Sequence, residues 1–248
     1  MPSVFSVFFA EKPDGPSRLP EYMQYMRAGA SALKKTNPDW DYVVLTDEAT
    51  APKLEHEFRI AVTAPDDVPL MLKYMMAQKE FLETNEGGIA ILAAADCVPN
   101  KDLRDAMRPM DGLAVTYRLD NHHINNVGYV RDRGLAVWFL SRAISILYGW
   151  DSKLQNWLGD QKSWEAALGP WDEPAVDVVR TARPDGRLIH IYPNHTHNRF
   201  TAKRGAWCFE SHKEALLLHF KGIRKTHMLE YVNQHILSRD TLNAGISS

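Results

Sequence analysis

The sequence predicts an α/β protein whose central sheet is mainly parallel and is flanked by helices. Short apolar segments alternate with segments of helical spacing in the first half of the chain, which is typical of strands joined by crossover helices. The segment IAILAAA, residues 89–95, carries no polar side chain. A strand that is apolar on both faces is usual in a parallel sheet covered by helices on each side.

Strands and helices alternate from the N-terminus to about residue 95. The segment SVFSVFFA, residues 3–10, is β-branched and aromatic and ends before charged residues, Pro13 and Gly15, which predicts a buried strand. Strong helix formers occupy residues 68–84, and Asn85 with the glycines after it is a typical helix stop. The other elements expected here are a helix over 20–35 and strands over 41–47, 58–63 and 89–95.

The second half predicts a less regular series of elements. We expect strands over 112–118, 125–131 and 215–220 and helices over 134–147, 160–168 and 226–237. Residues 171–210 are rich in Trp, Pro, His and Asn and are expected to be irregular. The tryptophans at 138, 150, 157, 164, 171 and 207 are expected to pack in the core rather than to form a stacking platform.

Composition narrows the class of protein. The 248 residues are 45 % hydrophobic and 24 % charged, with a net charge of −2, which is ordinary globular composition and offers no bulk positive charge for nucleic acid or membrane. Cys97 and Cys208 do not form a zinc spacing. The N-terminus lacks a basic signal-like region and no run reaches about 18 apolar residues, so a cytoplasmic protein without a membrane span is expected.

Polar residues that follow the predicted strands form the candidate site, because ligands of such sheets bind at the carboxyl ends of strands. Asp96 directly follows the apolar strand 89–95. A carboxylate there is costly to bury unless it is paired or binds a hard cation such as Mg²⁺ or Mn²⁺. The alternative is that Asp96 caps the turn or a following helix.

The segment HFKGIRK, residues 219–225, is the second candidate. His219 ends an apolar strand and could bind a divalent metal, Gly222 permits close approach of the backbone to a ligand, and Lys225 suits phosphate. The alternative is a core histidine followed by a solvated basic turn.

Three further positions have both a functional and a structural interpretation. Lys73 lies in the helix before the Asp96 strand and either faces a ligand or lies on a solvated helix face. Asp160 and Gln161 either contact a ligand or include the N-cap of a helix. Asn126, two residues before Gly128, either contacts a ligand or belongs to a turn.

In chain order these motifs resemble those of the GT-A glycosyltransferases, and most closely glycosyltransferase family 8, the retaining galactosyl- and glucosyltransferases related to glycogenin. The resemblance runs from about residue 5 to about residue 228. HFKGIRK matches His-x-x-Gly-x-x-Lys, the most specific motif. GDQKSWEAAL is similar to the Asp-Gln-Asp helix start, NNVGYV to Asn-[Ser/Ala]-Gly-Val, and ILAAADCVPNKDL to the strand that bears Asp-x-Asp.

The resemblance implies a GT-A fold and a hexosyltransferase-like enzyme that transfers a sugar from a nucleotide-sugar donor, UDP-sugar foremost, with retention at the anomeric carbon. It implies one domain over 1–248, with a nucleotide-binding half (1–100), a donor-sugar and acceptor half (101–240) and a loose tail (241–248). The acceptor, a carbohydrate or another hydroxyl compound, would be selected by 171–210, where IYPNHTHNRF offers polar and aromatic groups. A nucleic acid acceptor is disfavoured by the net charge.

The resemblance also implies roles for individual residues. Asp96 and His219 would bind the metal, Mn²⁺ foremost. Asp160, Gln161 and Asn126 would act at the reacting sugar. The donor would be bound by Ala10, Glu11, Asp47, Lys73, Gly222 and Lys225.

One position departs from the family pattern. The motif reads Ala94-Ala95-Asp96, so the first carboxylate of Asp-x-Asp is missing. Cys97 is a poor substitute, because a thiolate prefers softer metals and neighbouring strand residues point to opposite faces. A nucleotide-sugar-binding protein without turnover therefore stays open as an alternative function. A nucleotidyltransferase is a second alternative, but it is disfavoured because this sequence has no Gly-rich phosphate loop after the first strand.

Overall fold

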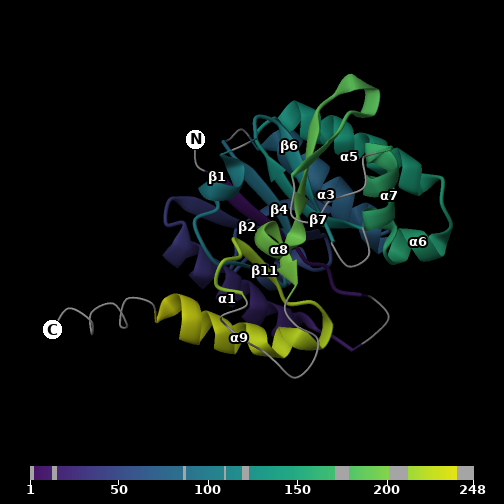
Figure 1. Cartoon of the computed structure of the whole chain (residues 1–248). Coiled ribbons are helices and arrows are strands. Elements are labelled where there is room, and N and C mark those ends of the chain that lie inside the picture. Colours follow the sequence, from purple (N-terminus) through teal and green to yellow (C-terminus); the bar gives the residue numbers. More distant parts are fainter. Residues whose placement is uncertain are drawn as a thin grey trace.

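A computed structural model describes residues 3–12, 16–85, 88–108, 110–118, 123–170, 179–200 and 212–238. Within these residues an eight-stranded sheet has the order β3-β2-β1-β4-β7-β6-β9-β8, and a small sheet has the order β10-β11-β5 (Figure 1). The strands are β1 (Ser3–Phe8), β2 (Trp40–Asp47), β3 (Ile60–Ala64), β4 (Ala90–Ala94), β5 (Cys97–Pro99), β6 (Leu113–Tyr117), β7 (Ile124–Val130), β8 (Arg180–Ala182), β9 (Ile189–Pro193), β10 (Arg199–Phe200) and β11 (Leu217–His219).

The helices connect these strands and cover the central sheet. They are α1 (Leu19–Thr36), α2 (Ala51–Leu54), α3 (Leu70–Thr84), α4 (Arg104–Met107), α5 (Arg133–Tyr148), α6 (Ser152–Asn156), α7 (Gly159–Leu168), the 3₁₀ turn η1 (Pro184–Gly186), α8 (Asn194–His197), the 3₁₀ helix η3 (Gly222–His227), α9 (Met228–Tyr231) and the π-helical η4 (Val232–Leu237). The long elements thus lie close to the expected ranges.

The central sheet is mixed rather than uniformly parallel. Its β3-β2, β2-β1, β1-β4 and β6-β9 pairs are parallel, whereas β4-β7, β6-β7 and β8-β9 are antiparallel. Parallel pairs therefore hold only a small majority, four of the seven among the described residues. β7 is antiparallel because it returns beside β6, its predecessor in the chain.

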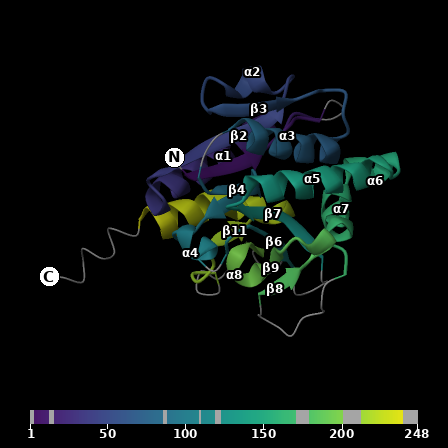
Figure 2. The same cartoon turned by 90° about the horizontal axis from the view of Figure 1, so that it is seen from above.

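Two hydrophobic cores lie on opposite faces of the sheet. Side chains of β1 alternate between them: Val4 and Phe8 join the core under α3, α5 and α7, and Phe5 and Val7 join the core under α1 and α4. In Figures 1 and 2, α3, α5 and α7 gather on one side of the sheet. On the other side, α1 lies beside the C-terminal helical segment, which consists of α9 and η4. This double cover explains the apolar sequence of β4.

Three expectations about elements were wrong in detail. Residues 179–200 of the segment expected to be irregular contain β8, η1, β9, α8 and β10, whereas 171–178 and 201–211 lie outside the described residues, as does the tail from 239 onward. The last strand is shorter than expected, Leu217–His219, and the last helix begins earlier, as η3, and ends as η4. β5 was not expected at all.

The tight turn after β4 places the candidate site. Ala95 and Asp96 reverse the chain so that β5 leaves the central sheet and pairs antiparallel with β11, with Cys97 opposite His219. The Phe220 N–H donates to the Asp96 carbonyl oxygen at 2.9 Å. The carboxyl end of β4 is thereby joined to the start of the basic segment 221–225.

No helix among the described residues is long and apolar enough to cross a membrane.

Candidate functional site

Asp96 is the centre of a buried group of charges. Its side chain is 9 % exposed, with Oδ1 3.2 Å from His219 Nε2 and Oδ2 2.9 Å from Lys225 Nζ. The three residues come from the end of β4, the end of β11 and η3. The structure therefore brings together three of the residues singled out from the sequence, and Asp96 is neither a simple turn cap nor solvent-exposed.

The cluster holds Asp96 and Lys225 in their charged forms. Burial by itself would raise the pKa of Asp96, but His219 and Lys225 hold that pKa well below its usual range. Burial would likewise lower the pKa of Lys225, but the interactions with Asp96 and Tyr22 raise it. A desolvated carboxylate and a desolvated ammonium thus stabilise each other's charge.

Lys225 is fixed by α1 as well as by Asp96. Its Nζ donates to the hydroxyl of Tyr22 and lies 4.4 Å from the centre of that ring, a cation–π contact. Tyr22 in turn stacks on Phe9, just beyond β1, with ring centres 4.6 Å apart. The lysine is 8 % exposed, so it is not part of a solvated basic turn.

Gly222 makes the turn that brings this lysine back to Asp96. Its φ is +66°, which lies in the left-handed region, where a glycine is favoured. A Cβ there would meet no atom of the described residues within 4 Å. The glycine is therefore needed for its backbone conformation, and the space beside it remains open.

Lys221 links Asp96 to the start of α7. The pKa of Lys221 is lowered, first by burial and then by the charge of Arg118, with Arg224 acting in the same direction; Asp96 and Asp160 both oppose this shift. Lys221 therefore lies within electrostatic range of both carboxylates. Two arginines, Arg118 and Arg224, also act on Lys221, so this residue lies among charges of both signs.

Asp160 lies in the first turn of α7 but does not cap the helix. The N-cap position is Leu158, with a φ of +61°, and no side chain caps the helix, so the interpretation of Asp160 as an N-cap is wrong. Asp160 is 1 % exposed and Gln161 is half-buried. A Cβ on Gly159 would lie 2.0 Å from the Leu154 carbonyl oxygen, so only glycine allows the backbone approach that starts this helix.

Asp47 and Lys73 form a separate buried ion pair. Lys73 Nζ lies 2.7 Å from Asp47 Oδ2 and also donates to the Asp66 carbonyl oxygen at 3.3 Å. The Thr50 N–H donates to Asp47 Oδ1 at 3.0 Å. Lys73 is 6 % exposed, so its interpretation as part of a solvated helix face is wrong, and both residues expected to meet the donor contact each other.

Ala10 and Glu11 follow β1 beside this pair. The Glu11 N–H donates to Thr50 Oγ1 at 3.1 Å, and Lys53 Nζ donates to Glu11 Oε2 at 2.6 Å. Hydrogen bonds from Lys53 and Ser17 lower the pKa of Glu11. Ala10 packs against the core under α3, so the residues after β1 and β2 form one connected edge.

Asn126 lies in β7 where the strand bulges. The pairing with β6 passes from Asn125 opposite Thr116 to Gly128 opposite Val115. The prediction of a turn before a strand is therefore wrong for Asn126, which lies within the strand. Its side chain lies outside what the structure describes.

Asp96, Cys97 and His219 could hold a metal ion, since one possible ligand atom of each lies within 4.8 Å of the others. Contrary to the expectation from strand alternation, Cys97 does not point away from Asp96. Asp96 belongs to the turn rather than to a strand, and Cys97 lies directly opposite His219 in the antiparallel pairing, where side chains share a face.

These three residues fit Mn²⁺ poorly. Hard divalent ions prefer several oxygen ligands, and the group offers one carboxylate, whose two oxygens already contact His219 and Lys225. Burial raises the pKa of the Cys97 thiol well above its usual range, and the charge of Asp96 raises it further, which disfavours the thiolate that a metal requires. Ala94 adds no ligand.

Trp157 was missed as a candidate site residue. Trp157 is 59 % exposed, so the expectation that it packs in the core was wrong. Trp164 is buried, as expected. Trp157 lies three residues before Asp160, and Lys12 Nζ lies 5.6 Å from its ring centre. Exposure next to GDQ is not visible from composition, because a buried and an exposed tryptophan look alike in sequence.

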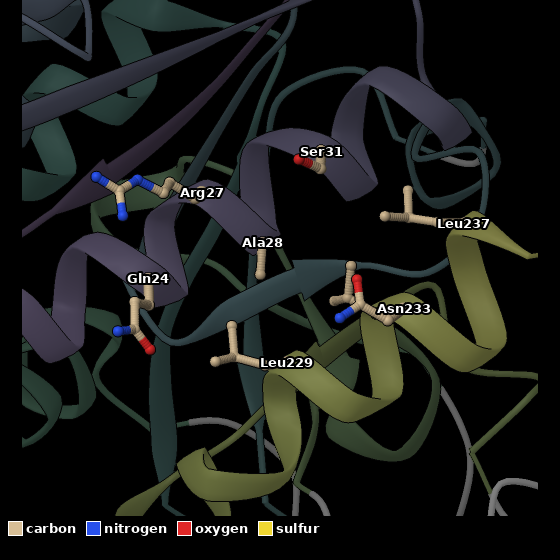
Figure 3. Close-up of a pocket in the computed structure, with 8 residues that line it drawn as sticks. Gln24, Arg27, Ala28, Ser31, Leu229, Asn233 and Leu237 are labelled. Carbon is tan, nitrogen blue, oxygen red and sulfur yellow. The ribbon is translucent and has the colours of Figure 1, made fainter.

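The groove between α1 and the C-terminal helical segment lies elsewhere. This hollow of about 390 Å³ is lined by residues that include Arg27, Ser31, Asn233 and Leu237 (Figure 3). None of the residues predicted for the candidate site lines it.

Known structures share this fold. A glycosyltransferase involved in the glycosylation of the major capsid of PBCV-1 is 11 % identical, with 94 % of this chain and 99 % of that chain covered and a TM-score of 0.56. The bifunctional glycosyltransferase WbbM is 8 % identical, with a TM-score of 0.53; 98 % of this chain matches 51 % of that one. An active-site variant of LgtC is 12 % identical, with 90 % and 88 % covered and a TM-score of 0.50.

These similarities confirm the predicted fold, a mixed α/β arrangement of the GT-A type with a large sheet flanked by helices. At such low identity they establish the fold alone. No family model matches the sequence, and no curated protein matches it.

Proposed function

We propose that this protein is a glycosyltransferase that transfers a hexose from a nucleotide-sugar donor, UDP-sugar foremost, to a carbohydrate or other hydroxyl acceptor. The observation that carries the proposal is the buried group of Asp96, His219 and Lys225 at the carboxyl end of β4, with Lys221 within electrostatic range of Asp96. Lysine ammonium groups and an imidazole held around one carboxylate suit a diphosphate, whose oxygens accept hydrogen bonds from such donors.

The chemistry needs these charges most at the transition state. As the bond between the anomeric carbon and the diphosphate oxygen breaks, negative charge grows on the diphosphate, and cations already in position stabilise it. The acceptor oxygen forms its bond on the same face of the sugar, which retains the configuration. Its proton passes to the leaving phosphate oxygen, so that charge and atoms balance.

The remaining predicted residues receive roles by their positions. Asp160, Gln161 and Asn126 act at the donor sugar; Ala10 and Glu11 contact the base, with Gly222 against the diphosphate. Asp47 and Lys73 act through their own ion pair, by holding the edge on which the nucleoside lies. Residues 1–100 supply the nucleotide half of a single domain and 101–240 the sugar and acceptor half.

The acceptor side requires a revised set of residues. Within IYPNHTHNRF, Tyr192 and Asn198 are fully buried, so they do not contact an acceptor. Trp157 is exposed beside the start of α7, and an exposed indole is a suitable surface for a sugar ring. We propose that an acceptor carbohydrate packs on Trp157.

Two finer expectations belong to this proposal. Mn²⁺ is the ion that the resemblance implies at Asp96 and His219. Because these residues fit Mn²⁺ poorly, ligand binding is measured both with and without it. A cytoplasmic location agrees with the free, buried thiol of Cys97.

The test is calorimetric titration of UDP into the protein, with Mn²⁺ and with EDTA, followed by a screen of UDP-sugars for UDP release. UDP should bind, and His219→Ala should weaken binding about tenfold, since a hydrogen bond to a charged group contributes about 1.5 kcal/mol or more. Lys79→Ala, whose lysine pairs with Glu83 on the surface of α3, is the matched control. Absence of UDP binding in both conditions would reject the proposal.

A second candidate function follows from Ala94. A protein that binds nucleotide-sugar without turnover would show UDP binding that depends on His219 but no UDP release from any donor, with or without acceptors. Release of pyrophosphate instead of UDP would indicate a nucleotidyltransferase.

A further inference from the structure

We propose that the ammonium group of Lys225 takes the place of a divalent ion, so that this protein binds a diphosphate without a metal. The inference rests on the proposed function for the identity of the donor. Its claim about the cation at Asp96 is separate and can be tested with a metal alone.

The first step is the occupancy of Asp96. Oδ2 lies 2.9 Å from Lys225 Nζ and Oδ1 lies 3.2 Å from His219 Nε2. Both oxygens of the only carboxylate in the group are therefore used by protein donors. A divalent ion bound to Oδ2 would have to lie beside an ammonium group, and like charges at that distance repel strongly in a buried site.

The second step is that Lys225 is held in place. Its Nζ also donates to the Tyr22 hydroxyl and lies 4.4 Å from the Tyr22 ring centre. Movement away from Asp96 would break the ion pair and the contacts with Tyr22 together. The side chain is 9 % exposed, so the protein encloses most of its surface. A lysine fixed in this way behaves as a resident cation.

The third step is that the ligand set lacks an oxygen next to a lysine that contacts the remaining carboxylate. Ala94, two residues before Asp96, supplies no carboxylate. Asp96 is the partner of both His219 and Lys225, while Lys221 also lies within electrostatic range of it. Lys225 and Lys221, with the charges of Arg118 and Arg224 that act on Lys221, outnumber the carboxylates of Asp96 and Asp160. This surplus of positive charge matches a diphosphate. An ammonium has three N–H groups, and the two described contacts leave one for a phosphate oxygen.

Binding of Mn²⁺ alone, followed by the electron paramagnetic resonance signal of free Mn²⁺, tests the proposal on wild type, Lys225→Met and Lys225→Arg. Wild type and Lys225→Arg should bind Mn²⁺ weakly. Lys225→Met should bind it at least about tenfold more tightly, because a like charge next to the carboxylate has been removed. Equal Mn²⁺ affinity in wild type and Lys225→Met would overturn the proposal.

Pyrophosphate binding provides a measurement that needs no variant. The affinity of wild type should be the same, within about twofold, in Mn²⁺ and in EDTA, whereas a metal that bridges protein and diphosphate would change it by tenfold or more. A requirement for Mn²⁺ in the wild type would overturn the proposal even if Lys225→Met does not fold.

The two proposals can fail separately. If wild type binds pyrophosphate in EDTA but UDP does not compete with it, the nucleotide donor is wrong and the role of Lys225 stands. If UDP binds only with Mn²⁺, the donor stands and the role of Lys225 is wrong.

Discussion

Two buried aspartate–lysine pairs lie at the carboxyl edge of the central sheet, and they differ in what surrounds them. Asp47 Oδ2 lies 2.7 Å from Lys73 Nζ, and both side chains are almost fully buried. Asp96 and Lys225 are 2.9 Å apart and are buried to a similar degree. The two pairs have the same chemistry at the same edge, so the contrast comes from their neighbours.

The Asp47 pair is balanced and closed. One oxygen of Asp47 accepts from Lys73 and the other from the Thr50 N–H, while Lys73 also donates to the Asp66 carbonyl oxygen. The Asp96 pair instead has a second partner, the imidazole of His219, and Lys221 within electrostatic range. We infer that a buried pair whose charges compensate each other stabilises the fold, whereas a pair with surplus positive charge nearby is suited to bind an anion.

Lys73→Met should have the largest effect on stability. Removal of the lysine leaves the Asp47 carboxylate buried without its partner, which costs about 3–5 kcal/mol in the free energy of unfolding. Urea unfolding measures this loss, and the double variant Asp47→Asn with Lys73→Met should recover most of it. Lys53→Met, at an exposed pair with Glu11, should cost less than about 1 kcal/mol; equal losses in the two single variants would contradict the contrast.

Asp96→Asn should have a smaller effect that an anion reverses. The change leaves His219 and Lys225 without their carboxylate, with an expected loss of about 2 kcal/mol, in the range for a buried polar group left without its partner. Added pyrophosphate should raise the unfolding temperature of this variant more than that of wild type, because the ligand supplies the missing charge. Asp47→Asn, which keeps the Asp96 site, should gain no more from pyrophosphate than wild type does. A similar gain in both variants would show that the two pairs do not differ.

Gly222→Ala should have the smallest effect. Its φ of +66° is unfavourable for any residue with a Cβ, and no atom lies within 4 Å of that Cβ, so the loss should be only the conformational cost of about 1 kcal/mol. The same change should weaken pyrophosphate binding, because this turn positions Lys221 and Lys225. Urea unfolding and calorimetry measure the two effects. A loss of stability with unchanged pyrophosphate binding would show that Gly222 does not contribute to the binding site.

The long elements were predictable because their side chains carry clear periodicity. α3 and β4 lie within two residues of the expected ranges. β5, β8 and β11 consist of three residues each, which is too short for a period of two to be distinguished from chance. Such strands form because a neighbouring strand is present to pair with them.

Candidate residues were predictable where a polar side chain follows an apolar strand. Asp96 and His219 were singled out on this basis, and Asp96 Oδ1 lies 3.2 Å from His219 Nε2. Their partners were not predictable: nothing in the sequence indicates that Lys73 pairs with Asp47, that Tyr22 holds Lys225, or that Trp157 is exposed. Each of these contacts joins segments that are distant in sequence or depends on how α1, α3 and α7 pack.

The sequence alone therefore determined the α/β class, the apolar central strands and the identity of the charged residues at their ends, because burial and chain direction are local properties of the pattern. Only the tertiary structure decided which charge meets which. Asp96 lies between His219 and Lys225 because the turn after β4 sends β5 beside β11. In a desolvated site the balance of charge depends on distances of a few ångströms, and those distances exist only in the folded chain.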